Sequence, residues 1–124
     1  MQIFCVAFFG ALGCLTRYGM SELIYRWLGD RFPYGILTIN ILGSFGIGFL
    51  AMVLMNRFPD QLIWRAALLI GFLGGFTTFS SFSYDLYQML HQGAFAKAGL
   101  YAIGSVLLSL LATFMGVFLA ELIG

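Results

Sequence analysis

The chain has very few charged residues. Of its 124 residues, only 9% are Asp, Glu, Lys or Arg and 61% are hydrophobic, whereas a soluble domain usually carries about 25% charged residues. Six basic residues against five acidic ones leave a net charge of +1, which gives no basic footprint for nucleic acid and does not describe a disordered polyampholyte. The composition therefore excludes a water-soluble globule and indicates a membrane protein with no nucleic-acid partner.

Histidine and cysteine are too scarce for most metal or disulfide chemistry. His91 is the only histidine, so a metal site of the usual kind is not expected. Cys5 and Cys14 lie nine residues apart on a predicted helix and point to nearly opposite faces, which disfavours a disulfide between them. The acids lie near the ends of the apolar runs and form no catalytic set, so we do not expect an enzyme.

Four long runs of the sequence contain no charge at all. A bilayer core takes about 20 residues of helix, and the runs predict four transmembrane helices in one domain, residues 1–124, at roughly 3–26, 34–56, 63–90 and 96–122. The first run has no positively charged start, and its apolar character continues beyond Arg17. We therefore interpret it as an uncleaved helix rather than a signal peptide.

The positive charges give no clear orientation in the membrane. The side with both termini and the second loop carries Arg57 and Arg65, and the opposite side carries Arg26, Arg31 and Lys97. Two against three is almost no bias under the positive-inside rule. Two interpretations stay open, an orientation set by other features or dual topology, in which copies insert both ways and pair antiparallel.

The third span holds the densest group of polar residues. Gly74 and Gly75 are followed by five Ser or Thr residues within the seven positions 77–83, and such a stretch makes a weak helix. A break at this depth frees carbonyl and amide groups to meet an ion. A Gly/Ser/Thr packing seam is the alternative, but we favour the break because the hydroxyls occupy every face.

Phe79 and Phe82 lie three residues apart in this stretch and share a helix face. Aromatic ring edges are electropositive, so edges turned into a pore could hold an anion without a full positive charge. From the spacing alone, packing against the core or lipid is the simpler interpretation.

The other spans carry isolated polar residues at depth, where each needs a partner or an aqueous pathway. Asn40 in the second span either joins helices or contacts a permeant species. Tyr101, Ser105, Ser109 and Thr113, spaced by four, form a hydroxyl stripe on the fourth span. Arg17 is the one charge embedded in a span, and it either snorkels or lines an aqueous vestibule.

Two other functions are compatible with four apolar spans that carry isolated polar residues. A small dual-topology proton-coupled exporter needs a mid-span acid, and the sequence has none. A non-transporting membrane assembly subunit would use its polar residues only to join helices. The sequence also has no Thr-Val-Gly-Tyr-Gly run of the potassium-filter type.

The chain resembles the Fluc (CrcB) family of fluoride channels from end to end, and three motifs in these spans carry the resemblance. They are Gly10-Ala11-Leu12-Gly13 followed by Arg17-Tyr18, then Asn40-Ile41-Leu42-Gly43-Ser44-Phe45, and finally Gly71-Phe72-Leu73-Gly74-Gly75-Phe76-Thr77-Thr78-Phe79-Ser80-Ser81-Phe82-Ser83. The resemblance implies an all-α membrane protein whose four-helix subunits, with the third helix broken mid-membrane, form an antiparallel dual-topology homodimer. It implies passive fluoride export across a bacterial plasma (inner) membrane.

The resemblance also implies a role for each polar group. The fluoride pore would be lined by Asn40, Phe79, Phe82, Ser80, Ser81, Tyr101, Ser105 and Ser109. Arg17 would face the aqueous vestibule. The backbone carbonyls of Gly74 and Thr77, with those of the second copy, would hold one structural sodium ion at the dimer centre. Ser81 and Asp85 stand where the family often has Thr and Glu, and the role of the Asp85 carboxylate stays open.

Overall fold

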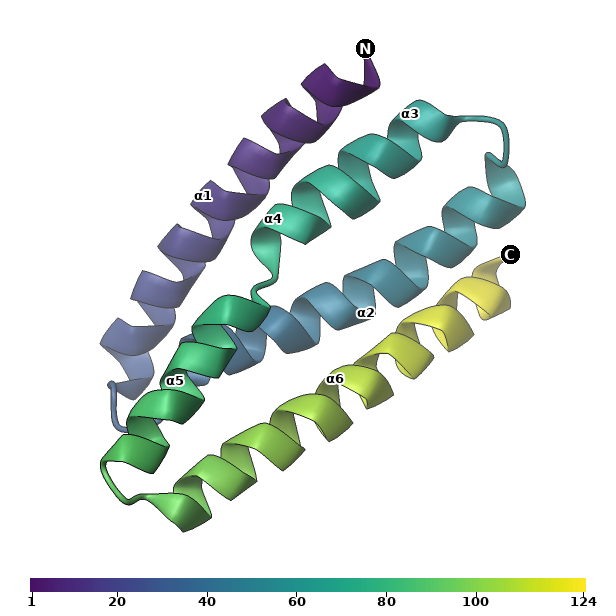
Figure 1. The fold of residues 1–124 in the computed structure, drawn as a ribbon. Coiled ribbons are helices and arrows are strands. Elements are labelled where there is room, and N and C mark those ends of the chain that lie inside the picture. Colours follow the sequence, from purple (N-terminus) through teal and green to yellow (C-terminus); the bar gives the residue numbers. More distant parts are fainter.

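The computed structural model describes residues 1–124, and its regular structure is entirely helical (Figure 1). Four helical units are long and apolar enough to cross a membrane. They are α1 (Gln2–Leu28), α2 (Tyr34–Arg57), a third unit from Leu62 to His91, and α6 (Phe95–Ile123). The prediction of an all-α protein with four membrane-spanning helices is confirmed.

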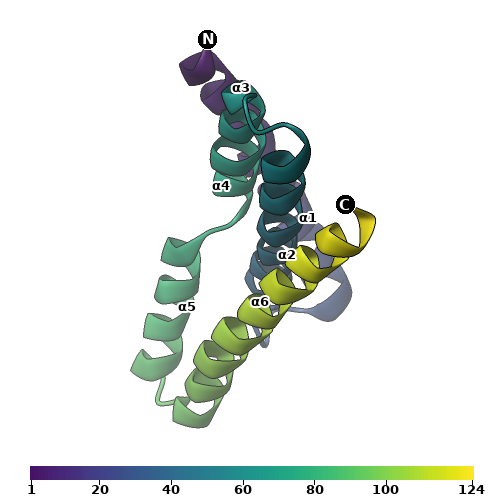
Figure 2. The ribbon, with the colours of Figure 1, turned by 90° about the vertical axis from the view of Figure 1, so that its right-hand side faces the viewer.

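The third unit is built from several pieces. It begins with α3 (Leu62–Trp64) and continues through η1 (Arg65–Leu73), a π-helical stretch, into α4 (Gly74–Phe76). Helix α5 (Phe79–His91) completes it. Thr77 and Thr78 between α4 and α5 have extended backbones, so the third helix is broken where the sequence predicts a weak point. Figure 2 shows that α5 is offset to one side of the line of α3 and α4.

The polypeptide ends and connections lie at two opposite ends of the bundle. Figure 1 shows both termini and the α2–α3 connection at one end, and the α1–α2 and α5–α6 connections at the other. Gly29 and Gly93, in the two connections at that second end, have positive φ angles of 81° and 78°. These are left-handed conformations that glycine adopts at little cost.

Small residues let the helices approach closely. A Cβ on Gly48 would collide with the Thr113 carbonyl of α6, and a Cβ on Gly116 would collide with the Phe45 carbonyl of α2. On the other side of the molecule, Gly13 of α1 lies directly against the backbone of Phe72 in η1. Close packing around small residues is a main source of helix association in lipid.

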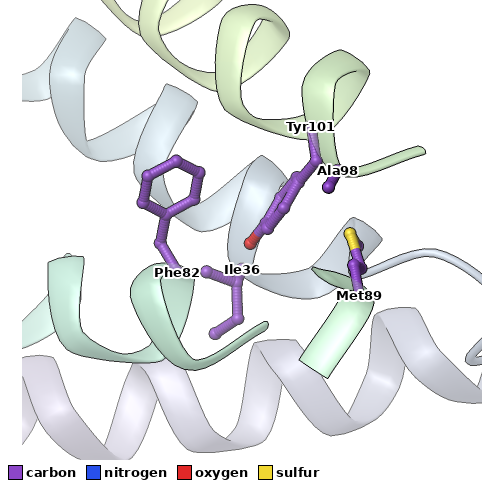
Figure 3. Close-up of a cluster of buried hydrophobic side chains, with 5 residues drawn as sticks. All are labelled: Ile36, Phe82, Met89, Ala98 and Tyr101. Carbon is purple, nitrogen blue, oxygen red and sulfur yellow. The ribbon is translucent and has the colours of Figure 1, made fainter. Parts of the chain in front are cut away.

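Large apolar side chains cover most of the outer surface, as expected for contact with lipid. The one buried apolar cluster gathers where α2, α5 and α6 meet, and Figure 3 shows its five members. These are Ile36, Phe82, Met89, Ala98 and Tyr101. Tyr101 is its most buried member, 1% exposed, and the cluster fixes the position of α5 beyond the break.

Candidate functional site

A cavity of about 350 Å³ lies beside the break in the third helix. Its walls come from α2, from η1 and α4, from the break itself, and from α5 and α6. The residues lining it are Asn40, Gly43, Ser44, Ile47, Leu69, Leu73, Gly74, Thr77, Thr78, Phe79, Phe82, Ser105, Val106 and Ser109. None of these side chains is charged, so any hydrogen bonds that the cavity offers come from amide, hydroxyl and backbone groups.

Asn40 of α2 is joined to the break by two hydrogen bonds. Its Nδ2 donates to the Thr78 carbonyl at 3.0 Å, and its Oδ1 accepts from the Thr78 N–H at 2.9 Å. The side-chain amide thus satisfies both backbone groups of a residue that has left the helix. An Asn amide has two N–H donors, so one N–H remains after this pairing.

Thr77, the other break residue, is held from two sides. Its N–H and its Oγ1 both donate to the Leu73 carbonyl, each at 3.0 Å. Its own carbonyl accepts a hydrogen bond from Nη1 of Arg17 at 3.4 Å. The structure therefore places the Arg17 guanidinium on the backbone of the break, and Arg17 is not among the residues that line the cavity.

Thr78 starts the next helix. Its Oγ1 accepts a hydrogen bond from the Ser81 N–H at 3.2 Å and donates to the Ser81 Oγ at 3.2 Å. A Thr hydroxyl at this position satisfies an amide that has no partner within the helix. Ser80 is exposed, and its Oγ lies 3.3 Å from the Thr78 Oγ1. Both serines contact Thr78, and neither lines the cavity.

Three aromatic rings form a continuous contact along α5 and α6. The ring centroids of Phe79 and Phe82 are 5.5 Å apart and tilted by 57°, and those of Phe82 and Tyr101 are 5.0 Å apart in an edge-to-face arrangement. Phe82 is 7% exposed, whereas Phe79 is 77% exposed although it lines the cavity. The cavity is therefore lined by one buried ring, Phe82, and one exposed ring, Phe79.

Tyr101 connects this aromatic contact to the far end of the bundle. Its hydroxyl donates to Oδ2 of Asp85 at 3.1 Å. Asp85 in turn lines a second cavity of about 320 Å³. That cavity is lined by Tyr25, Asp30, Arg31, Pro33, Asp85, Gln88, Met89, Gln92 and Lys97. The structure thus gives the Asp85 carboxylate a hydrogen-bond partner, Tyr101.

The hydroxyls of α6 are not equivalent. Ser105 is 7% exposed, and its Oγ is buried without a hydrogen-bond partner. Thr113 donates to the Ser44 carbonyl of α2 and to the Ser109 carbonyl, both at 3.1 Å, so it joins helices. Ser105 and Ser109 line the cavity beside the break, called the central cavity from here on, and Tyr101 is not among its lining residues.

Thr78 and Ser44 line the cavity beside the predicted residues. Thr78 belongs to the hydroxyl run at 77–83, and Thr is one of the residues preferred at the start of a helix. Ser44 lies one turn after Asn40 on the same face of α2. Both signals are present in the sequence, but they compete with hydroxyls that only bond within their own helix.

The site has no conventional metal ligands. No group of three or more His, Cys, Asp or Glu side chains is placed to hold a metal ion. Gly74 and Thr77 do both line the central cavity. Any cation at the break would therefore be held by uncharged oxygen atoms of backbone carbonyl, amide or hydroxyl groups, which are ligands that hard cations accept.

Comparison with known proteins covers almost the whole chain. Residues 4–117 match the family model described as CrcB-like protein, Camphor Resistance (CrcB). A protein of Geobacter metallireducens named "Fluoride-specific ion channel FluC" is 43% identical over 123 residues, which cover 98% of each chain. A protein of Magnetococcus marinus with the same name is 41% identical over 123 residues, covering 99% of this chain and all of the other.

One similar protein is considerably longer. A Methylococcus capsulatus protein, also named "Fluoride-specific ion channel FluC", is 43% identical over 121 residues. That match covers 98% of this chain but 53% of the Methylococcus protein. The similarity thus extends over all four spanning units of this chain and about half of that relative.

Proposed function

The chain belongs to the CrcB family, and from this premise we propose that it conducts fluoride passively through the central cavity, down the fluoride gradient and out of a bacterial cell. It is a multi-pass membrane protein and a fluoride channel, not an enzyme. One observation supports the route most directly. A cavity at the helix break is lined by uncharged groups, and one of them, the buried Ser105 Oγ, has no partner.

Uncharged donors suit the energetics of this ion. Fluoride is small and strongly hydrated, and stripping its water in a medium of low dielectric costs tens of kcal/mol by Born-type estimates. A hydrogen bond to a charged group contributes roughly 1.5–3 kcal/mol net, so several donors are needed. Conduction also requires release, and a row of neutral donors binds the ion less tightly than a fixed cation in the pore.

Asn40 is the first of these donors. Its two bonds to Thr78 fix the orientation of the amide, and its second N–H is the group that we assign to fluoride. Ser105 and Ser109 on α6 also line the cavity and supply hydroxyls. Ser80 and Ser81 hold the cap of α5 through Thr78, so in this proposal they support the pore wall.

Ring edges continue the route. Aromatic edges carry partial positive charge, and Phe79 and Phe82 both line the cavity with tilted planes. Beyond Phe82 the route follows Tyr101. The Tyr101 hydroxyl donates a hydrogen bond to Asp85, which lines the second cavity. We assign that cavity as the outlet, because it is the polar space next to the last of the three contacting rings, Tyr101.

A second copy of the chain completes the channel. Phe79 lines the cavity and is 77% exposed, so a partner subunit is needed to close this side of the route. The balance of positive charge between the two ends of the bundle supports insertion in both directions, and we propose an antiparallel dual-topology homodimer in the plasma (inner) membrane.

We assign a structural sodium ion to the centre of this dimer, held by the Gly74 and Thr77 carbonyls of both copies. The donor set fits a hard cation, because it consists of oxygen atoms. The Thr77 carbonyl already accepts a hydrogen bond from the Arg17 guanidinium. A carbonyl oxygen has a second lone pair, which would contact the ion. The ion would join the two breaks and is not transported.

Efflux from proteoliposomes tests the proposed function. Vesicles loaded with potassium fluoride and made permeable to potassium with valinomycin should release fluoride when they contain the protein. Vesicles loaded with potassium chloride should not release chloride. Equal release of both halides, or no release of fluoride from folded protein, would contradict the proposal.

Assembly needs a separate measurement. Reporters fused to the C-terminus should be active on both sides of the membrane, and a reporter active on one side only would exclude dual topology. Replacing sodium by N-methylglucamine should increase subunit exchange between differently labelled copies. Exchange that does not depend on sodium would remove the sodium ion from the proposal.

A further inference from the structure

A helix break brings a difficulty for an anion pathway. The carbonyl oxygens that it frees carry partial negative charge and repel an anion, while they attract cations. Thr77 and Thr78, the two residues of the break, both line the cavity. In this structure neither carbonyl is bare, because Thr77 accepts from Arg17 at 3.4 Å and Thr78 accepts from Asn40 at 3.0 Å.

The position of Arg17 follows from the packing of α1. Gly13, one turn earlier on the same helix face, lies against the backbone of Phe72 and Phe76. This close approach brings the next turn of α1 to the level of the break. Arg17 is half-buried, and its guanidinium reaches Thr77 without lining the cavity. The Arg17 guanidinium therefore meets the break from the side of α1.

We propose that Arg17 is a positioning residue that makes the break favourable to an anion. Its guanidinium offsets the partial negative charge of the Thr77 carbonyl and holds that carbonyl in place, as Asn40 does for Thr78. The cavity then presents N–H and O–H donors, while each break carbonyl already accepts one hydrogen bond. This inference rests on the proposed fluoride route and adds to it a determinant of anion over cation preference.

The indirect placement of the charge matters for conduction. A guanidinium inside the cavity could bind fluoride through several N–H groups and slow its release. Behind the Thr77 carbonyl, the charge acts on the ion through one backbone dipole, and the path stays free. The second lone pair of that carbonyl remains available to a metal cation, so the role of Arg17 is compatible with sodium at the dimer centre.

Arg17→Gln tests the inference, with Arg57→Gln as its matched control. Arg57 also donates from a guanidinium to a backbone carbonyl, that of Ile123 at 3.2 Å, but on the exposed end of the bundle. We expect Arg17→Gln to lower fluoride flux at least about tenfold and Arg57→Gln to leave it unchanged. The reversal potential in planar bilayers should also show a lower fluoride-over-potassium permeability ratio for Arg17→Gln, which a merely structural role would not produce.

Arg17→Lys covers the case in which Arg17→Gln does not fold. Lysine keeps the charge, so we expect a folded Arg17→Lys protein to keep its anion preference and to conduct within about tenfold of the parent. Folded Arg17→Gln with parental flux, or folded Arg17→Lys that has lost its anion preference, would overturn the inference. A parent protein without fluoride flux would instead contradict the proposed function, so the two failures are distinguishable.

Discussion

The side-chain amide of Asn40 replaces helical hydrogen bonds for Thr78, a residue 38 positions away, by donating to its carbonyl and accepting from its N–H. A helix interrupted in a membrane must satisfy its freed backbone groups within the protein. Asn40 does this with one planar group that has a donor and an acceptor side by side. The same residue therefore stabilises the break and faces the cavity that the break creates.

Asn40→Asp should keep one of the two hydrogen bonds to Thr78 and remove the other. The carboxylate can still accept from the Thr78 N–H, but it cannot donate to the Thr78 carbonyl and would repel it. We expect the free energy of unfolding to fall by roughly 1–3 kcal/mol or more and fluoride flux to be lost. Thermal unfolding in detergent and efflux from proteoliposomes measure the two effects. Asn56→Asp, at the exposed end of α2, is the control, and parental flux in Asn40→Asp would refute the assigned role.

The two phenylalanines of the cavity should respond differently to substitution by isoleucine. Phe79 is 77% exposed and Phe82 is 7% exposed. We expect Phe79→Ile to lower flux with little change in unfolding, and Phe82→Ile to lower both, because Phe82 packs in the buried cluster. Phe114→Ile, on the exposed surface of α6, should change neither. Undiminished flux in Phe79→Ile would count against a role for the ring edge.

Ser105→Ala should lower flux without destabilising the fold. The Ser105 Oγ is buried and unpartnered, and removing an unsatisfied hydroxyl is neutral or stabilising, by up to roughly 1 kcal/mol. Its loss deprives the cavity of a donor. Thr113→Val is the opposite case, because the Thr113 hydroxyl makes two hydrogen bonds. That variant should be less stable while its folded fraction conducts normally. A Ser105→Ala protein that conducts like the parent would remove Ser105 from the route.

Glycines on α2 and α6 should differ in their tolerance of alanine. A Cβ at Gly48 meets the Thr113 carbonyl, whereas a Cβ at Gly104 meets nothing within 4 Å. We expect Gly48→Ala to lower the midpoint of thermal unfolding because the two helices must separate. Gly104→Ala should raise it, since alanine favours a helix over glycine by about 1 kcal/mol. Equal effects of the two substitutions would show that close contact does not limit this interface.

The residue pattern alone predicts a large part of the architecture. Charge-free runs predict four spanning helices, and the glycines and hydroxyls of residues 74–83 predict the break found at Thr77 and Thr78. The same pattern does not orient the helices about their axes. Phe79 and Phe82 illustrate this, because both follow one helical spacing while one is open and the other is buried. Spacing along one helix shows which side chains share a face, but it does not show which other helix packs against each of them.

Membrane insertion, helix number and the weakness of the third helix were determined by the sequence itself, because they depend on local composition and propensity. The partners of the polar groups were decided only by tertiary structure. Arg17 reaches Thr77 across 60 residues of chain, and Ser105 is left without a partner while Thr113 has two. These outcomes depend on how closely glycine lets the helices approach and on their mutual rotation, which no single segment of sequence encodes.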